Sequence, residues 1–147
     1  MAETDPAVRK TAIAKQFIQA IPHSRDLGME LVELGPGWVV MALDYDPRFV
    51  GEPETGVLHG GVITALLDTS GGASVMTHPE APGGTATIDL RIDYMRAAAP
   101  GKRVYARAEC YRITRTVAFV RAFAYTDSIE EPVAAAHGAF TVERGSS

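Results

Sequence analysis

The residues best suited to chemistry lie in one short segment, Thr55–Thr69, which reads TGVLHGGVITALLDT. Gly60 and Gly61 follow His59 at the point where an apolar helix is expected to begin. A helix normally starts at Ser, Thr, Asp or Asn, whose side-chain oxygen accepts a hydrogen bond from a backbone N–H of the first turn. Because two glycines stand where that residue should be, we expect the N–H groups of this turn to stay free for another acceptor.

Asp68 is the only ionisable side chain between Gly61 and Thr77. A carboxylate can attack a carbonyl carbon or activate a water molecule, and free N–H groups at a helix start can stabilise the negative charge that develops on the carbonyl oxygen. The alternative is a solvated aspartate on an exposed stripe, but that stripe also holds Gly71 and Val75 and is poorly polar. We therefore expect Asp68 to be catalytic.

The spacing of these groups requires two chains. Gly60 and Asp68 are eight positions apart (68 − 60), which is about 12 Å along a helix with a rise of 1.5 Å per residue. Both groups must lie within about 3–3.5 Å of the same reacting centre. Two antiparallel helices across a two-fold axis would bring Gly60 of one chain to Asp68 of the other and would form two identical sites. We expect at least a homodimer, with its active sites at the subunit interface.

The first half of the chain predicts the helix that carries these groups. Apolar residues at three- and four-residue intervals predict an amphipathic helix over Pro6–Ile21, ended by the proline that follows. Two strand-like runs, Met29–Leu34 and Trp38–Tyr45, are joined by a Gly-Pro-Gly turn and predict a hairpin. The segment Asp46–Val57 is rich in proline and glycine and predicts a loop. Gly61–Thr77 predicts a long, mostly apolar helix that is buried.

The second half predicts an antiparallel sheet. Thr85–Met95 alternates strictly, with Ile88 and Tyr94 on its apolar face, which is typical of a half-buried strand. Three further strand-like runs follow, separated by short turns. They lie near Arg103–Ile113, Thr116–Tyr125 and Pro132–Val142. The predicted fold is α+β, with one antiparallel sheet of about five or six strands, a long central helix that the sheet buries, and a short N-terminal helix.

Composition limits the class of protein. The 147 residues, 46% of them hydrophobic, predict a single domain over residues 1–147, in which residues 1–24 form an N-terminal helical extension. The net charge of −4 is spread along the chain without a basic block, so we expect no nucleic-acid and no membrane partner. The sequence shows no signal-peptide pattern and no apolar run of about 20 residues, and we expect a cytoplasmic protein.

Cysteine and histidine usage predicts no metal site. Cys110 is the only cysteine, which excludes an intramolecular disulfide and a thiolate cluster and favours a small buried residue. The four histidines, His23, His59, His78 and His137, are far apart without the spacing of metal ligands. No Gly-x-Ser-x-Gly segment is present, so a serine hydrolase is not indicated.

The pattern resembles a known family. The motif Gly56-x-x-His59-Gly60-Gly61, followed by Asp68 nine residues after the histidine and by Thr87-Ile88-Asp89-Leu90, is similar to that of the hotdog-fold acyl-CoA thioesterases of the PaaI-like, phenylacetate-pathway type. The likeness extends from about residue 27 to residue 142. It implies a hotdog fold, an acyl-CoA substrate, and a dimer or a dimer of dimers. An apolar lining could hold an aromatic ring or a medium-chain acyl group, and no residue decides between them. We expect no cofactor.

The resemblance also implies roles for single residues. The Gly60 amide would hold the oxyanion, and Asp68 would act as nucleophile or general base. Thr87 would orient the carboxylate or the water, although strand alternation sends it to the face opposite Ile88, so it must lie near an edge or a subunit contact. His59 would position the thiolate or brace the loop. The expected substrate-binding residues are Gly61, Arg115, Arg112 and Arg96, the arginines for the phosphates of coenzyme A.

One departure from the family keeps alternatives open. Many members have Asn or Gln six residues before the histidine, where this chain has Pro53, which cannot donate a hydrogen bond. The missing amide would be replaced by Glu52, Glu54 or Thr55, or by nothing. A non-catalytic protein that binds acyl-CoA or acyl-carrier protein is therefore one alternative. A hotdog hydratase or dehydratase is the other, although the histidine–carboxylate spacing of that class is missing here.

Overall fold

The computed structural model describes residues 5–80 and 83–144, so residues 1–4 of the expected N-terminal extension, and residues 81–82 and 145–147 of the expected domain, lie outside the described part. The helices are α1 (Pro6–Ala20), α2 (Pro22–Asp26) and α3 (Gly60–Met76). The strands are β1 (Glu30–Gly35), β2 (Trp38–Leu43), β3 (Val50–Glu52), β4 (Val57–Leu58), β5 (Thr87–Tyr94), β6 (Val104–Ile113), β7 (Val117–Tyr125) and β8 (Ala134–Thr141).

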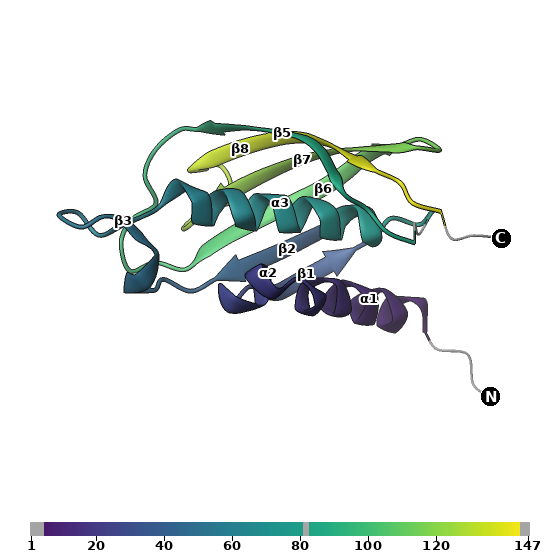
Figure 1. Ribbon diagram of the computed structural model, residues 1–147, viewed down its shortest axis with the longest axis horizontal. Helices are drawn as coiled ribbons and strands as arrows, with labels where there is room; N and C mark the ends of the chain where they lie inside the picture. Colours follow the sequence, from purple (N-terminus) through teal and green to yellow (C-terminus); the bar gives the residue numbers. More distant parts are fainter. Residues whose placement is uncertain (1–4, 81–82, 145–147) are drawn as a thin grey trace.

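Six strands form one antiparallel sheet in the order β1-β2-β6-β7-β8-β5. The sheet wraps around α3, while α1 and α2 lie beside α3 on the side of β1 and β2 (Figure 1). The predicted α+β architecture, an antiparallel sheet around a long helix with a short N-terminal helix, is confirmed. Because β5 is an outermost strand, one of its edges is unpaired in the single chain.

Small side chains allow α3 to pack closely on the sheet. Along β6, Val104, Ala106 and Ala108 alternate with more exposed residues and are fully buried under the helix. From α3, Leu66 and Leu67 are fully buried as well. The prediction that this helix is buried is confirmed, and its backbone is therefore a fixed support for the side chains that it carries.

The N-terminal segment forms two helices, where the sequence predicted one. Ile21 is extended (φ −96°, ψ 105°), because a residue before proline is excluded from the helical region, and Pro22 then starts α2 at a position that suits it. Five residues are too few to show a helical period. Ser24 of α2 is buried, and its hydroxyl lies 2.8 Å from that of Thr69 in α3, which fixes the pair of helices to the core.

The segment expected to be a loop, Asp46–Val57, also contains regular structure. A 3-10 turn covers Pro47–Phe49, and β3 and β4 form a separate two-stranded hairpin that leads into α3. The prediction of a loop was wrong here because strands of three and two residues are too short to show alternation.

Leu66→Ala should lower the free energy of unfolding by about 2–5 kcal/mol, because it leaves a cavity between α3 and the sheet. The measurement is urea unfolding at one fixed protein concentration. Val8→Ala is the matched control, since the side chain of Val8 is 57% exposed on α1 and its loss should change stability by no more than about 0.5 kcal/mol. Equal losses in the two variants would contradict the assignment of the core.

Candidate active site

His59 begins α3 and caps it. Its backbone is extended (φ −60°, ψ 135°), and its Nδ1 accepts a hydrogen bond of 2.8 Å from the N–H of Gly61. A Cβ on residue 61 would lie 2.9 Å from that nitrogen, so the glycine makes room for the cap. The expectation that both glycine amides are free is therefore wrong for Gly61. For the N–H of Gly60, the structure shows no acceptor among residues 5–80 and 83–144.

The backbone of His59 is fixed by the β3–β4 hairpin and by the turn that precedes it. The His59 N–H donates to the carbonyl of Phe49 at 2.8 Å, and a Cβ on Gly51 would lie only 2.8 Å from the Cα of His59. The hairpin backbone thus packs directly on the residue. Because Nδ1 accepts a hydrogen bond, the proton of the neutral ring lies on Nε2. The exposed ring can then donate from Nε2 to a ligand.

The carbonyl of Gly60 ties the start of α3 to the end of β5. It accepts hydrogen bonds from the Tyr94 hydroxyl at 2.8 Å and from the Thr64 hydroxyl at 3.0 Å, and these two hydroxyls also contact each other. The sequence placed Tyr94 only on an apolar strand face and missed this contact. The available signal was the residue type, since tyrosine joins an apolar ring to a polar group that needs a partner.

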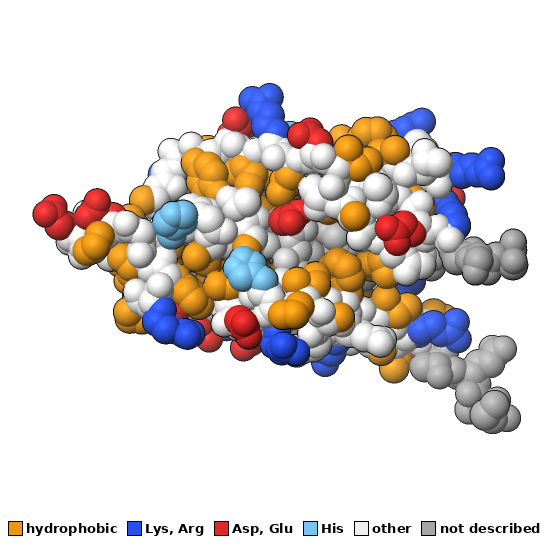
Figure 2. All heavy atoms as spheres, viewed as in Figure 1, with side chains coloured by type: hydrophobic (Ala, Val, Ile, Leu, Met, Phe, Trp, Pro, Cys, Tyr) orange, Lys and Arg blue, Asp and Glu red, His pale blue; other side chains and the backbone are white. Residues whose placement is uncertain are grey.

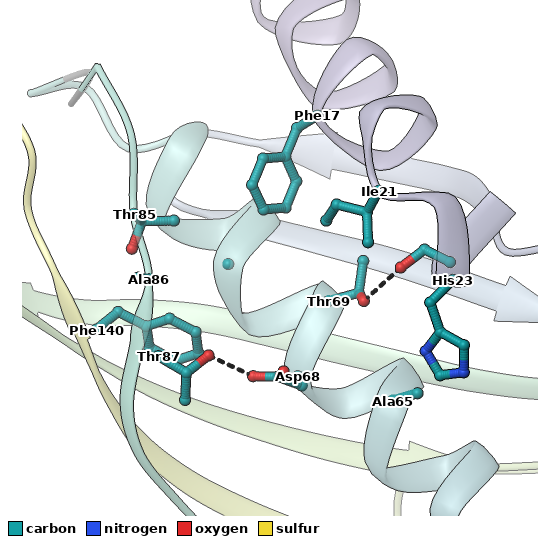
Figure 3. A pocket seen from close by; sticks show the side chains of 12 residues that line it. Phe17, Ile21, His23, Ala65, Asp68, Thr69, Thr85, Ala86, Thr87 and Phe140 are labelled. Atoms are coloured by element: carbon teal, nitrogen blue, oxygen red, sulfur yellow. Dashed lines mark hydrogen bonds between the residues drawn. The ribbon is translucent and has the colours of Figure 1, made fainter.

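Asp68 and Thr87 form a hydrogen-bonded pair. The Thr87 hydroxyl donates to Oδ1 of Asp68 at 2.6 Å, and Oδ2 has no partner among the residues that the structure describes (Figure 3). Asp68 is half-buried in the middle of α3, and Thr87 is exposed at the start of β5. A carboxylate held by one oxygen, with the other oxygen open, can take a proton from water or attack a carbonyl.

A β-bulge turns Thr87 toward α3. Thr87 pairs with Phe140 and Asp89 with Ala139, which leaves Ile88 as an extra residue in β5. The extra residue reverses the alternation of the strand. Thr87 therefore shares a face with the buried Phe140, against the expectation from simple alternation, while Ile88 is 57% exposed. The expectation that Thr87 lies near an edge is confirmed, since β5 is an edge strand.

The two groups that are expected to act together, the amide of Gly60 and the carboxylate of Asp68, stay apart within one chain. Gly60 and Asp68 lie on one continuous α-helix, with about 12 Å between them along its axis. The structure therefore brings together Asp68 with Thr87, and separately His59 with Gly61 and Gly60 with Tyr94. It does not bring Gly60 to Asp68 in the single chain.

A pocket of about 300 Å³ opens beside Asp68, between α1 and α2 on one side and the segment leading into β5 on the other (Figure 3). Its lining is largely apolar and includes side chains that the sequence did not point to, among them Phe17 and Ile21. In the space-filling view of this face, hydrophobic side chains are spread over the middle of the molecule (Figure 2). The only sequence signal for these walls was the amphipathic period of the N-terminal helix.

A second hollow of about 390 Å³ adjoins the start of α3. His59, Gly61 and Phe49 line it, as does His23, which also lines the first pocket. Arg48 also lines this hollow. Its guanidinium is paired with Asp46 at 2.9 Å, and the hydrogen bond between them lowers the pKa of the Asp46 carboxyl. The sequence did not single out His23 or Arg48.

The three arginines expected to bind phosphate lie at opposite ends of the sheet. The Arg96 N–H donates to the carbonyl of Val133, just before β8, whereas Arg115 follows β6 in the turn that contacts the end of β8. The length of β8 separates them by about 27 Å. Arg112 is exposed near the Arg115 end. One chain therefore cannot direct all three side chains at the same phosphate.

Pro53 lies in the exposed turn between β3 and β4, away from Asp68. The neighbouring polar side chains are used within this turn. Oε1 of Glu52 accepts a hydrogen bond from the Glu54 N–H at 3.0 Å, and the Thr55 hydroxyl bonds to the Glu52 carbonyl. Within one chain, none of these three residues contacts the Asp68–Thr87 pair.

Other reactive groups are poorly suited to chemistry. Burial raises the pKa of the Cys110 thiol to about 11, so it stays protonated, in agreement with the predicted apolar role. Burial also lowers the pKa of His78, beyond the end of α3.

Within the described ranges, no cluster of three His, Cys, Asp or Glu side chains could hold a metal ion. Nor is any helix there long and apolar enough to cross a membrane.

Comparison with known proteins gives consistent matches. A protein-family model, that of the thioesterase superfamily, matches residues 55–133. The medium/long-chain acyl-CoA thioesterase YigI of Escherichia coli strain K12 is 32% identical over 122 residues, which cover 74% of this chain and 78% of that protein.

Solved structures match over most of the chain. A crystal structure from Pseudomonas aeruginosa has a TM-score of 0.82 at 41% identity and covers 90% of this chain and 98% of that one. The Escherichia coli PaaI protein from the phenylacetic acid degradation operon has a TM-score of 0.84 over 97% of this chain and 99% of its own. Its identity is 15%, so that likeness concerns the fold alone.

Proposed function

Because this chain belongs to the thioesterase superfamily and is a thioester hydrolase, we propose that it hydrolyses an acyl-CoA with an aromatic or medium-chain acyl group, releasing the free acid and coenzyme A. The observation that carries this proposal is the Asp68–Thr87 hydrogen bond at the mouth of an apolar pocket. An apolar pocket suits an acyl group, and a carboxylate beside it suits attack on the thioester carbonyl. Family membership favours hydrolysis over the non-catalytic binder and the hydratase or dehydratase.

The complete site consists of two chains in this proposal. Its support is the separation of Gly60 from Asp68 along α3, together with the open edge of β5 beside them. That edge carries unpaired backbone groups. Ile88 in β5 and Met95, the residue after β5, have exposed apolar side chains, which are 57% and 56% exposed. If two β5 edges pair across a two-fold axis, the α3 helices run antiparallel and the start of each approaches Asp68 of the other. The dimer is the minimal active unit, and a dimer of dimers keeps the same site.

Hydrolysis would then proceed as follows. The thioester carbonyl oxygen accepts a hydrogen bond from the Gly60 N–H of one chain, and Asp68 of the facing chain removes a proton from water as the water oxygen attacks the carbonyl carbon. The negative charge on the carbonyl oxygen is stabilised by the amide and by the helix N-terminus. The C–S bond then breaks, the acid forms, and coenzyme A leaves as its thiolate. Asp68 as nucleophile uses the same open oxygen and passes through a mixed anhydride that water hydrolyses.

His59 has two roles in this scheme. As the cap of α3 it occupies the Gly61 amide, so that Gly60 alone offers a free N–H at the helix start. Its Nε2–H can donate to the leaving thiolate. Gly61 thus serves the site by admitting the cap rather than by binding substrate through its amide.

The arginines fit coenzyme A only across the dimer. In an antiparallel pair, the Arg115 end of one chain lies beside the Arg96 end of the other, so phosphates could meet a guanidinium from each. Arg112 stays a secondary candidate at the Arg115 end. A single domain over residues 1–147 and a cytoplasmic location also stay predictions.

Asp68→Asn should lower kcat by about 10²–10⁴-fold, because an amide neither accepts the proton of water nor attacks the carbonyl. Coenzyme A release is followed with a thiol reagent over a panel of aromatic and aliphatic acyl-CoAs. Asp89→Asn is the matched control, an exposed carboxylate of β5 beyond the bulge, and should keep near wild-type turnover. Equal rates in Asp68→Asn and wild type would refute the assignment of the carboxylate.

Gly60→Pro should remove the oxyanion donor alone. Proline suits the first helical position, and the extended His59 that precedes it is compatible with proline. We expect kcat to fall by about 10²–10³-fold with thermal stability preserved. Gly60→Ala keeps the N–H, and its Cβ would meet Tyr94 at an ordinary 3.7 Å, so it should lose far less activity. If Gly60→Pro turned over as fast as Gly60→Ala, the amide would have no part in the reaction.

A further inference from the structure

The pocket beside Asp68 is closed at one end by an aromatic ring. Phe17 of α1 rests directly on Gly72 of α3, where a Cβ would lie 2.9 Å from Cζ and 3.3 Å from Cε1 of that ring. The methyl group of Thr85 lies 3.7 Å from the same point. Three elements therefore meet at this end, namely α1, α3 and the segment before β5, and Figure 3 shows the ring of Phe17 directed at α3.

This closed end is one helical turn from the expected reacting centre. Gly72 follows Asp68 by four residues, which is about 6 Å along the axis of α3. Apolar atoms line the way between them, from Ile21 and Phe140. The opposite end of the pocket holds the imidazole of His23 and continues toward the second hollow. The apolar end suits the tail of an acyl group better than the polar end does.

The ring is held by a rigid support. Ile18, in the next position of α1, is buried in the core, and Ala14 one turn earlier is fully buried. The buried hydroxyl contact between Ser24 and Thr69 fixes α2 to α3 close to Asp68. Phe17 is thus a fixed wall of the pocket rather than a loose side chain on an exposed helix.

We propose that Phe17, seated on Gly72, is the residue that limits the length of the acyl group. A pocket of about 300 Å³ lies at the small end of the range for ligand pockets. That size corresponds to a medium-chain aliphatic acyl group or to one aromatic ring with a short linker. This inference rests on the proposed thioesterase function, and it assigns to the N-terminal helices the selection of substrate.

The test compares kcat/KM for straight-chain acyl-CoAs from four to sixteen carbons in the wild type and in variants at the closed end. Wild-type activity should peak at medium chain lengths rather than at sixteen carbons. Phe17→Ala opens the end, so the optimum should move to longer chains, with a gain of about fourfold for each further methylene that becomes buried. Gly72→Ala adds a methyl group 2.9 Å from Cζ of the fixed Phe17 ring and so takes up space at this end, and the optimum should move to shorter chains.

Phe123→Ala is the matched control, because Phe123 lies on β7 at a half-buried position away from this pocket and should keep the wild-type order of chain lengths. Thermal unfolding of each variant shows that it is folded. Opposite shifts for Phe17→Ala and Gly72→Ala support the proposal. If both folded variants keep the wild-type order of kcat/KM over the chain lengths, the proposal is overturned, whatever the absolute rates are.

The same variants are also tested with uncleavable S-alkyl-CoA thioethers of the same chain lengths, by their effect on the melting temperature. This measurement separates the two proposals. If no acyl-CoA is hydrolysed but the best-bound length shifts with Phe17→Ala, the thioesterase function fails and the limit on chain length stands. If acyl-CoAs are hydrolysed and neither profile shifts, the function stands and the limit on chain length fails.

Discussion

The fixed separation between the start of α3 and Asp68 is the constraint on which the site depends. A single buried helix carries both groups, and its rise holds them about 12 Å apart whatever the side chains do. No rotamer of Asp68 spans that gap. In the proposed mechanism, the helix therefore provides a complete site only by facing a second copy of itself, and we propose that this copy binds at the unpaired edge of β5.

Two local departures from regular structure determine which polar groups face the site. At the start of α3, the imidazole of His59 replaces the usual oxygen as cap, which occupies Gly61 and leaves the Gly60 amide open. In β5, the extra residue Ile88 reverses the alternation and turns Thr87 toward Asp68. Without the bulge, the hydroxyl would lie on the outer face of the sheet. The free amide of Gly60 thus depends on the cap by His59, and the Asp68–Thr87 pair depends on the extra residue Ile88.

Periodicity predicted the elements that are long enough to show it. The first hairpin, the long buried helix and the strands of the second half were predicted to within a few residues, since each extends over several repeats of its pattern. The five residues of α2 and the short strands β3 and β4 were missed because they are shorter than that.

The side-chain environment of the site was predicted less completely. The motif drew attention to His59, Gly60 and Asp68, but the cap and the bulge depend on hydrogen bonds between distant residues that no spacing reveals. The pocket wall at Phe17 results from packing between helices far apart in the sequence. For the arginines, the sequence grouped residues that the structure separates. Their side chains are all suited to phosphate, but they lie at two ends of the sheet in one chain.

A complementation experiment tests the two-chain site most directly. Asp68→Asn and Gly60→Pro chains are co-expressed in equal amounts, and the activity of the mixture is compared with that of each variant alone. A hybrid dimer then contains one site with both changes and one site with neither. The account predicts recovery to about one quarter of wild-type activity, since half of randomly paired dimers are hybrids with one intact site of two. A mixture no more active than its two inactive parents would contradict it, because it would mean that each chain carries its own complete site.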